Sequence, residues 1–210
     1  MHKLRPKIRS ATGKGAKISS NSWGGPGITD EVYPLANILK NNPDHLFIAS
    51  ASNENEEITP CNPKMTCSAK AENQICVGAT TKEDTIWIKN ATYGSNWGKP
   101  YVHVMAPGKD IKGLALNHNF YDWADGTSYA CPHVSGLAAL LMTMRGNLSP
   151  LKVKQLIVEN VQLKAQYADH VTSGGLIDVK KTIDALIAGT DFIHGHCHLL
   201  QLPKQCQLCH

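Results

Sequence analysis

The most informative segment of this chain covers residues 126 to 136 and reads Gly126-Thr127-Ser128-Tyr129-Ala130-Cys131-Pro132-His133-Val134-Ser135-Gly136. Its first two residues tolerate turns, and an apolar run with small residues follows at 134–144. This pattern predicts a loop that enters a tightly packed helix, with Pro132 near the start, where a missing N–H costs little. We therefore expect Ser128 at the helix N-terminus, where free N–H groups and the helix dipole favour a developing negative charge.

The segment resembles the nucleophile motif of the subtilisin family of serine proteases, Gly-Thr-Ser-Met-Ala-x-Pro-His-Val-(Ala/Ser)-Gly. Tyr129 replaces the usual Met, and Ser135 stands where Ala is common. The resemblance implies that Ser128 is the catalytic nucleophile, which needs a base beside it. A lone Ser here would be expected only to cap the helix, but the match over the whole segment favours the nucleophile. His133 lies five residues further along the same helix, so we expect a structural role for it.

A second match is the stretch Leu46-Phe47-Ile48-Ala49-Ser50-Ala51-Ser52-Asn53-Glu54-Asn55, which begins as an apolar run and ends in polar residues. The pattern predicts a buried parallel strand followed by a loop. An Asn that merely ends a strand is common. The stretch, however, resembles the family's strand that ends in Ala-Gly-Asn-Glu, in which the Asn amide donates a hydrogen bond to the oxyanion. The resemblance implies this catalytic role for Asn53, with Ser52 in place of the usual Gly.

The stretch from Lys17 to Pro26 resembles the family's strand that pairs with the substrate backbone and extends the peptide as an added strand. The resemblance implies a substrate pocket with two walls. Ser22, Trp23 and Gly24 would form one wall, and Ala51 and Ser52 the other. An ordinary packed aromatic is an equally good interpretation of Trp23. The expected partner is a peptide or protein substrate.

Three further matches follow in the family's order, so the resemblance extends from about Ala16 to Leu186. The matching stretches are Ser95-Asn96-Trp97-Gly98, Val102-His103-Val104-Met105-Ala106-Pro107-Gly108 and Ser173-Gly174-Gly175-Leu176-Ile177-Asp178-Val179. Strands that alternate with helices predict an α/β fold, a three-layer arrangement with helices on both faces of a parallel sheet. We expect strands near Ile18, Leu46–Ser50, Gln74–Ala79, Ile86–Ile88 and Tyr101–Met105, and helices at Val32–Lys40, after Ser128, at Ser149–Glu159 and at Val179–Ala188.

The family's catalytic Asp and His precede the Ser along the chain, and both lie N-terminal to the substrate-pairing strand, which begins here near Lys17. Nothing in the sequence resembles either motif. His2 belongs to a basic end, and we expect His45 to be a loop residue away from the catalytic face. The sequence thus predicts a subtilisin-like catalytic domain truncated at the N-terminus, inactive alone, with a missing N-terminal segment or pro-region as a possible partner. A non-catalytic peptide-binding relative is the alternative.

The composition predicts three regions: a basic disordered end at 1–15, the catalytic-domain part at 16–188 and a His/Cys-rich tail at 189–210. The chain has 210 residues, 42% of them hydrophobic and 18% charged, which fits a globular enzyme. The net charge is +4, and much of it lies in the first seventeen residues. No aromatic residue accompanies these charges, so we expect no nucleic-acid partner. No segment is long enough to predict a membrane span.

Seven cysteines suggest an oxidising compartment, and with the family resemblance they predict an extracellular or secretory-pathway protein, although no signal-peptide pattern is present. Cys61 and Cys67 bracket a Pro-containing loop and could form a disulfide. Cys76 lies in an apolar strand, where we expect it buried and free. Cys131 is expected to be packed and inert. Sequons for N-glycosylation begin at Asn90 and Asn147.

The tail ends in Cys206-Gln207-Leu208-Cys209-His210, which matches a c-type haem attachment pattern. The family resemblance offers no support for haem, and we expect no cofactor in the chemistry. Zinc binding by the tail remains a further alternative. Structural calcium is frequent in the family, but the sequence does not place its ligands.

Overall fold

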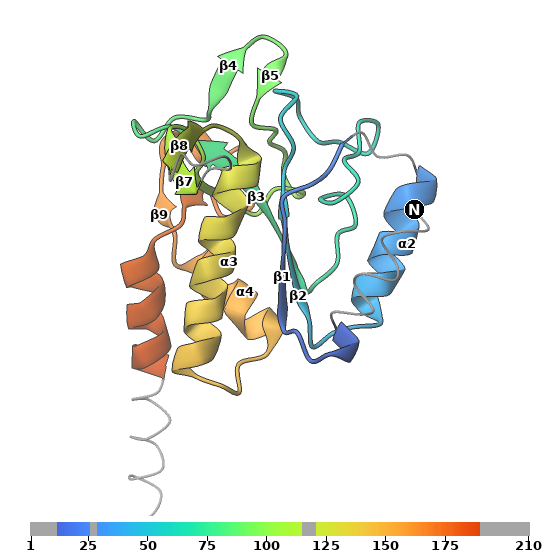
Figure 1. Ribbon diagram of the computed structural model, residues 1–210, viewed down its shortest axis with the longest axis vertical. Helices are drawn as coiled ribbons and strands as arrows, with labels where there is room; N and C mark the ends of the chain where they lie inside the picture. Colours follow the sequence, from blue (N-terminus) through green and yellow to red (C-terminus); the bar gives the residue numbers. More distant parts are fainter. Residues whose placement is uncertain (1–11, 26–28, 115–120, 190–210) are drawn as a thin grey trace, which may run out of the picture.

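The computed structural model describes residues 12–25, 29–114 and 121–189 (Figure 1). Most of the predicted basic end and nearly all of the His/Cys-rich tail lie outside these residues. Within the described part, no helix combines the length and the apolar composition that a membrane crossing requires.

The centre of the molecule is a six-stranded sheet with the order β1-β2-β3-β6-β10-β9. Neighbouring strands are parallel, except that β9 runs antiparallel to β10. The strands are β1 (Ile18–Asn21), β2 (Leu46–Ser50), β3 (Gln74–Thr80), β6 (Val104–Pro107), β9 (Gln162–Leu163) and β10 (Gly175–Leu176).

Helices cover both faces of this sheet (Figure 1). Helix α2 (Thr29–Lys40) lies on one face, and α3 (Thr127–Met144), α4 (Pro150–Glu159) and a last helix at 179–189 lie on the other. Successive side chains of β2 point to opposite faces of the sheet and so contribute to both hydrophobic cores. Leu46 and Ile48 pack with α3 and α4, whereas Phe47 and Ala49 pack with α2. The predicted three-layer α/β fold is confirmed, since a parallel sheet is stable only when both of its faces are covered.

Two antiparallel hairpins are added to this core. One is formed by β4 (Ile88–Asn90) and β5 (Tyr93–Gly94), and the other by β7 (Ile111–Leu114) and β8 (Tyr121–Ala124). The first projects beyond the sheet, at the top of Figure 1. The sequence predicted a strand near Ile86–Ile88, which overlaps β4 at Ile88, but it predicted neither hairpin. It also placed β6 three residues too early, because Tyr101 and Val102 belong to a turn in which both N–H groups bond the Gly98 carbonyl.

The helix starts agree with the turn chemistry of the sequence. The Ser149 hydroxyl accepts a hydrogen bond from the Lys152 N–H at 3.2 Å, and Pro150 is the first residue of α4. In α3, Pro132 lies within the helix and has no N–H to offer the carbonyl four residues earlier, that of Ser128. That carbonyl instead accepts the Ser22 hydroxyl at 2.7 Å, which connects the helix to the segment after β1.

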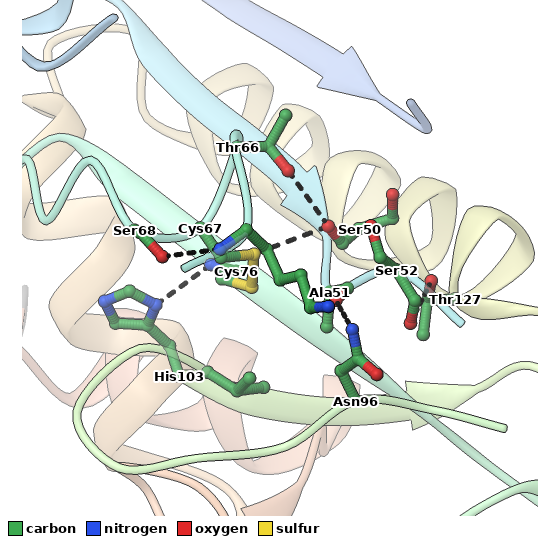
Figure 2. The surroundings of a disulfide bond; sticks show 12 residues. Ser50, Ala51, Ser52, Thr66, Cys67, Ser68, Cys76, Asn96, His103 and Thr127 are labelled. Carbon is green, nitrogen blue, oxygen red and sulfur yellow. Dashed lines mark hydrogen bonds between the residues drawn. A yellow bond between two sulfur atoms is a disulfide. The ribbon is translucent and has the colours of Figure 1, made fainter. Parts of the chain in front are cut away.

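The structure corrects the predicted cysteine pairing. Cys67 and Cys76 form the disulfide, with their Cα atoms 5.4 Å apart, whereas Cys61 is exposed and free (Figure 2). The apolar strand β3 has two faces: Ile75 and Val77 point toward α3, and Cys76 points toward the opposite core, where Cys67 lies. Cys131 is buried and free, as expected, and burial raises the pKa of its thiol.

We expect the double variant Cys67→Ala/Cys76→Ala to lower the free energy of unfolding by about 2–3 kcal/mol, since this bridge closes a short loop. Urea denaturation under oxidising conditions would measure the loss. Cys61→Ala is the matched control and should leave the unfolding midpoint unchanged. An equal loss in the control would contradict the observed pairing.

Candidate active site

Ser128 is the second residue of α3, at the end of the helix where backbone N–H groups lack intrahelical acceptors. The helix follows Gly126, whose φ of 142° is a backbone conformation that residues with a Cβ rarely adopt. The sharp entry leaves Ser128 half-buried in the first turn of the helix. This placement agrees with the sequence-based prediction.

The Asn53 side chain lies against the same helix end. Its Oδ1 accepts two hydrogen bonds from Thr127, one from the backbone N–H at 2.9 Å and one from the hydroxyl at 2.9 Å. Because both contacts use the oxygen, the Nδ2 amide is directed away from them and remains available as a donor. Asn53 and Ser128 both line one cavity, so the structure brings the two predicted catalytic residues together.

Ser22 forms two hydrogen bonds with Ser128. The Ser128 hydroxyl donates to the Ser22 carbonyl at 3.3 Å, and the Ser22 hydroxyl donates to the Ser128 carbonyl at 2.7 Å. The segment after β1 is thereby held beside the nucleophile.

The cavity beside Ser128 has a volume of about 340 Å³. The predicted residues Ser22, Trp23, Gly24 and Ser52 line it, but Ala51 is fully buried and is not among the lining residues. A Cβ on Gly24 would come within 2.6 Å of the Ser52 hydroxyl oxygen, so the two walls leave no room for a side chain there. Its full lining is Ser22, Trp23, Gly24, Ser50, Ser52, Asn53, Glu54, Thr92, Tyr93 and Ser128.

Trp23 has both of the roles that the sequence left open. It lines the cavity, and its ring also packs edge-on against Phe47, with ring centroids 6.2 Å apart.

Sequence reasoning missed Thr92 and Tyr93, which reach the cavity from the β4–β5 hairpin. This hairpin is tied to the loop after β2 by hydrogen bonds from the Asn55 amide to the carbonyls of Asn90 and Ala91, at 3.4 and 3.2 Å. No local pattern indicates such a contact between segments 35 residues apart.

Ser52 lies in the left-handed region, with a φ of 70°. This conformation costs a non-Gly residue about 1–2 kcal/mol, which accounts for the Gly expected at this place by resemblance. The strain lies next to Asn53, at the turn that directs its side chain toward α3.

None of the described histidines hydrogen-bonds Ser128. His133 is exposed and bonds the Tyr129 carbonyl at 2.8 Å. His45 lies in the loop before β2, as expected, and is buried there; its ring nitrogens lie 2.9 and 2.8 Å from Ala16 O and Ser19 Oγ. Burial lowers the pKa of His103 to about 3, so its ring is neutral and accepts the Cys76 N–H at 2.9 Å.

Across residues 12–25, 29–114 and 121–189, no three His, Cys, Asp or Glu side chains come together in a way that could hold a metal ion.

The known proteins to which this chain is similar indicate one protein family. The chain is 31% identical over 141 residues to the alkaline serine exoprotease A of Vibrio alginolyticus, covering 67% of this chain and 22% of that protein. It is 34% identical over 136 residues to the alkaline protease 1 of Aspergillus clavatus, covering 64% of this chain and 28% of the relative. The chain thus spans about a quarter of the length of these relatives.

Solved structures show the same fold. The chain superposes on the prenylagaramide maturation protease PagA with a TM-score of 0.68 and 28% identity, covering 87% of this chain and 66% of the other. A structure of the subtilase cytotoxin SubAB gives a TM-score of 0.74 at 22% identity, covering 87% of this chain and 64% of that one, which shows likeness of fold alone. The subtilase family model, Peptidase_S8, matches residues 2–183. The chain therefore belongs to the subtilase family of serine peptidases.

Proposed function

We propose that this chain carries the nucleophile and the oxyanion-binding groups of a serine endopeptidase. The observation that supports the proposal is that Ser128, in the first turn of α3, and Asn53 line one cavity. Peptide or protein substrates are the expected partners.

The proposed reaction is acyl transfer. Ser128 Oγ attacks the carbonyl carbon of the scissile peptide and gives its proton to a base. The negative charge formed on the carbonyl oxygen is held by Asn53 Nδ2 and the Ser128 N–H. The amine leaves with that proton, and water then hydrolyses the acyl-enzyme.

We propose that the base comes from outside the described residues; in support, none of the described histidines hydrogen-bonds Ser128. We propose that the chain alone is inactive, because a serine hydroxyl without a base is a weak nucleophile. A chain joined to a subtilase N-terminal portion that carries the Asp and His, here called the completed enzyme, is expected to hydrolyse peptides.

A fluorophosphonate probe tests this directly. We expect no labelling of Ser128 in the chain alone and rapid labelling in the completed enzyme, both read by mass spectrometry of the peptide that contains residue 128. Labelling of the chain alone, lost in Ser128→Ala, would show that it already contains a base.

Peptide binding without catalysis is the second candidate function. The bond from the Ser128 hydroxyl to the Ser22 carbonyl favours it, since that hydroxyl is engaged as a donor with no base. A completed enzyme that binds peptides in the groove but never forms an acyl-enzyme would support this candidate.

We also propose an extracellular or secretory-pathway location. The disulfide supports it, because such bonds persist in oxidising compartments. One relative, 28% identical over 152 residues, is the extracellular basic protease of Dichelobacter nodosus.

A further inference from the structure

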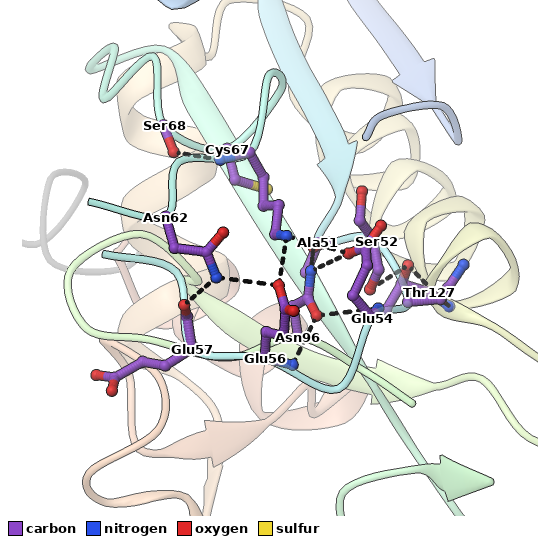
Figure 3. Close-up of polar contacts among 12 residues, drawn as sticks. Ala51, Ser52, Glu54, Glu56, Glu57, Asn62, Cys67, Ser68, Asn96 and Thr127 are labelled. Carbon is purple, nitrogen blue, oxygen red and sulfur yellow. Dashed lines mark hydrogen bonds and ion pairs between the residues drawn. The ribbon is translucent and has the colours of Figure 1, made fainter. Parts of the chain in front are cut away.

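A buried lysine lies behind the candidate site. Only 2% of the Lys64 side chain is exposed, although a lysine normally keeps its ammonium in water. The residue belongs to the loop between the candidate site and the disulfide, and the surrounding polar contacts are drawn in Figure 3. Burying a charge is costly unless it is paired, so the partners of Lys64 show what the burial accomplishes.

The ammonium pairs with two carboxylates that lie within three residues after Asn53. Lys64 Nζ lies 2.8 Å from Glu56 Oε2 and 3.6 Å from Glu54 Oε2. The bond to Lys64 is the main cause of a lowered pKa at Glu56, so the Glu56 carboxylate is charged at neutral pH. Glu54 itself lines the cavity beside Ser128.

Asn96 completes the attachment of this segment. Its Nδ2 donates to Glu54 Oε2 at 2.6 Å and to the Ala51 carbonyl at 2.9 Å. Its Oδ1 accepts the N–H groups of Glu54 and Glu56, at 3.1 and 3.0 Å. The residues on both sides of Asn53 are therefore held through side chains, in addition to the backbone hydrogen bonds that join this segment to residues 94–97.

The lysine is itself anchored to the sheet. The Lys64 N–H bonds Ser68 Oγ at 2.9 Å, the Thr66 hydroxyl bonds the Ser50 carbonyl at 3.3 Å, and Cys67 is bonded covalently to β3 (Figure 2). The ammonium thus connects a covalently fixed loop to the strained turn that carries the oxyanion amide.

We propose that Lys64 is a positioning residue for Asn53: its buried ammonium holds Glu54 and Glu56 and so fixes the turn from which the Asn53 amide reaches the cavity. The part of this inference that concerns catalysis rests on the proposed peptidase function. The part that concerns the order of the turn does not.

Hydrogen exchange of the full chain tests the structural part. Lys64→Met keeps the apolar stem and removes the charge, and we expect exchange at residues 53–57 to rise about tenfold, equivalent to about 1.4 kcal/mol of local opening free energy. Strand β3 and helix α4 serve as internal references. Lys180→Met is the matched control, since it removes the exposed Lys180–Asp184 pair of 2.6 Å, and it should leave 53–57 unchanged.

Glu56→Gln is the second variant, in case Lys64→Met does not fold. This variant removes the charge of the half-exposed Glu56 and so weakens the closer of the two ion pairs of Lys64. The hydrogen-exchange rate at residues 53–57 should rise, by a smaller factor than in Lys64→Met. Unchanged exchange in the variants, or an equal rise over the whole chain, would overturn the inference.

The completed enzyme tests the catalytic part. Lys64→Met should lower kcat by about 10- to 100-fold with KM nearly unchanged, because a displaced donor weakens transition-state binding. A higher KM with intact kcat would overturn the positioning role. If the completed enzyme with Lys64 intact shows no turnover, the proposed function fails, and the exchange experiment alone decides the inference.

Discussion

In the completed enzyme, Ser128→Ala is expected to abolish peptide hydrolysis and acyl-enzyme formation. The variant removes the only atom proposed to bond the substrate covalently, and the remaining donors can only bind the oxyanion of a slow attack by water. Subtilisin, a member of the same family, is the reference case: loss of its nucleophile costs about 10⁶-fold in kcat, with residual catalysis of roughly 10³–10⁴-fold over water. Steady-state kinetics on a chromogenic peptide would measure the loss.

Ser135→Ala is the matched control for that prediction. Ser135 lies on the same helix, and its hydroxyl donates to the Cys131 carbonyl at 3.0 Å, away from the cavity. It should retain nearly full kcat. Comparable losses in both variants would mean that the serines of α3 matter for folding, and the nucleophile would have to be sought elsewhere.

Asn53→Ala is expected to lower kcat of the completed enzyme by about 10²–10³-fold, the loss known for the corresponding donor in subtilisin itself. KM should change little, because the amide is proposed to contact the oxyanion and not the ground-state carbonyl. The substitution also removes the two bonds from Thr127 that cap α3. Asn53→Asp separates the two effects, since it keeps the acceptor oxygen but has no N–H to donate.

We therefore expect both Asn53 variants to lose turnover, while only Asn53→Ala loosens the start of α3. Asn160→Ala is a control for loss of an amide at a helix end, because its Nδ2 bonds the Leu156 carbonyl at 2.8 Å far from the cavity. Its kcat should match that of the parent. A raised KM with normal kcat in Asn53→Ala would identify Asn53 as a residue that shapes the loop without contacting the oxyanion.

The residues that could be predicted from the sequence lie where a short pattern determines the local geometry. Gly126 and the helix that follows it place Ser128 at the helix N-terminus, and the buried strand β2 ends so that Asn53 lies at the same edge of the sheet. Both follow from turn chemistry, apolar patterning and family resemblance, without knowledge of distant contacts.

The rest depends on contacts between distant segments. Tyr93 enters the cavity only because the β4–β5 hairpin folds back onto Asn55. The Cys67–Cys76 pairing depends on which face of β3 the loop crosses. Lys64 has the local appearance of a surface residue, and its burial is explained only by carboxylates that the fold brings beside it.

The contact between Asn53 and Thr127 has a consequence for heat inactivation. Asn53 Oδ1 and the Ser52 carbonyl both accept hydrogen bonds from Thr127. These bonds join the turn after β2 to the first turn of α3, so the proposed donor and the nucleophile move as one body. Fraying at the start of this helix would release both groups at once. Thermal loss of catalysis should then follow one sigmoidal curve that coincides with the melting of α3. Its midpoint should lie at or below the midpoint of global unfolding. At no temperature should the enzyme keep the nucleophile in place and lack the oxyanion donor.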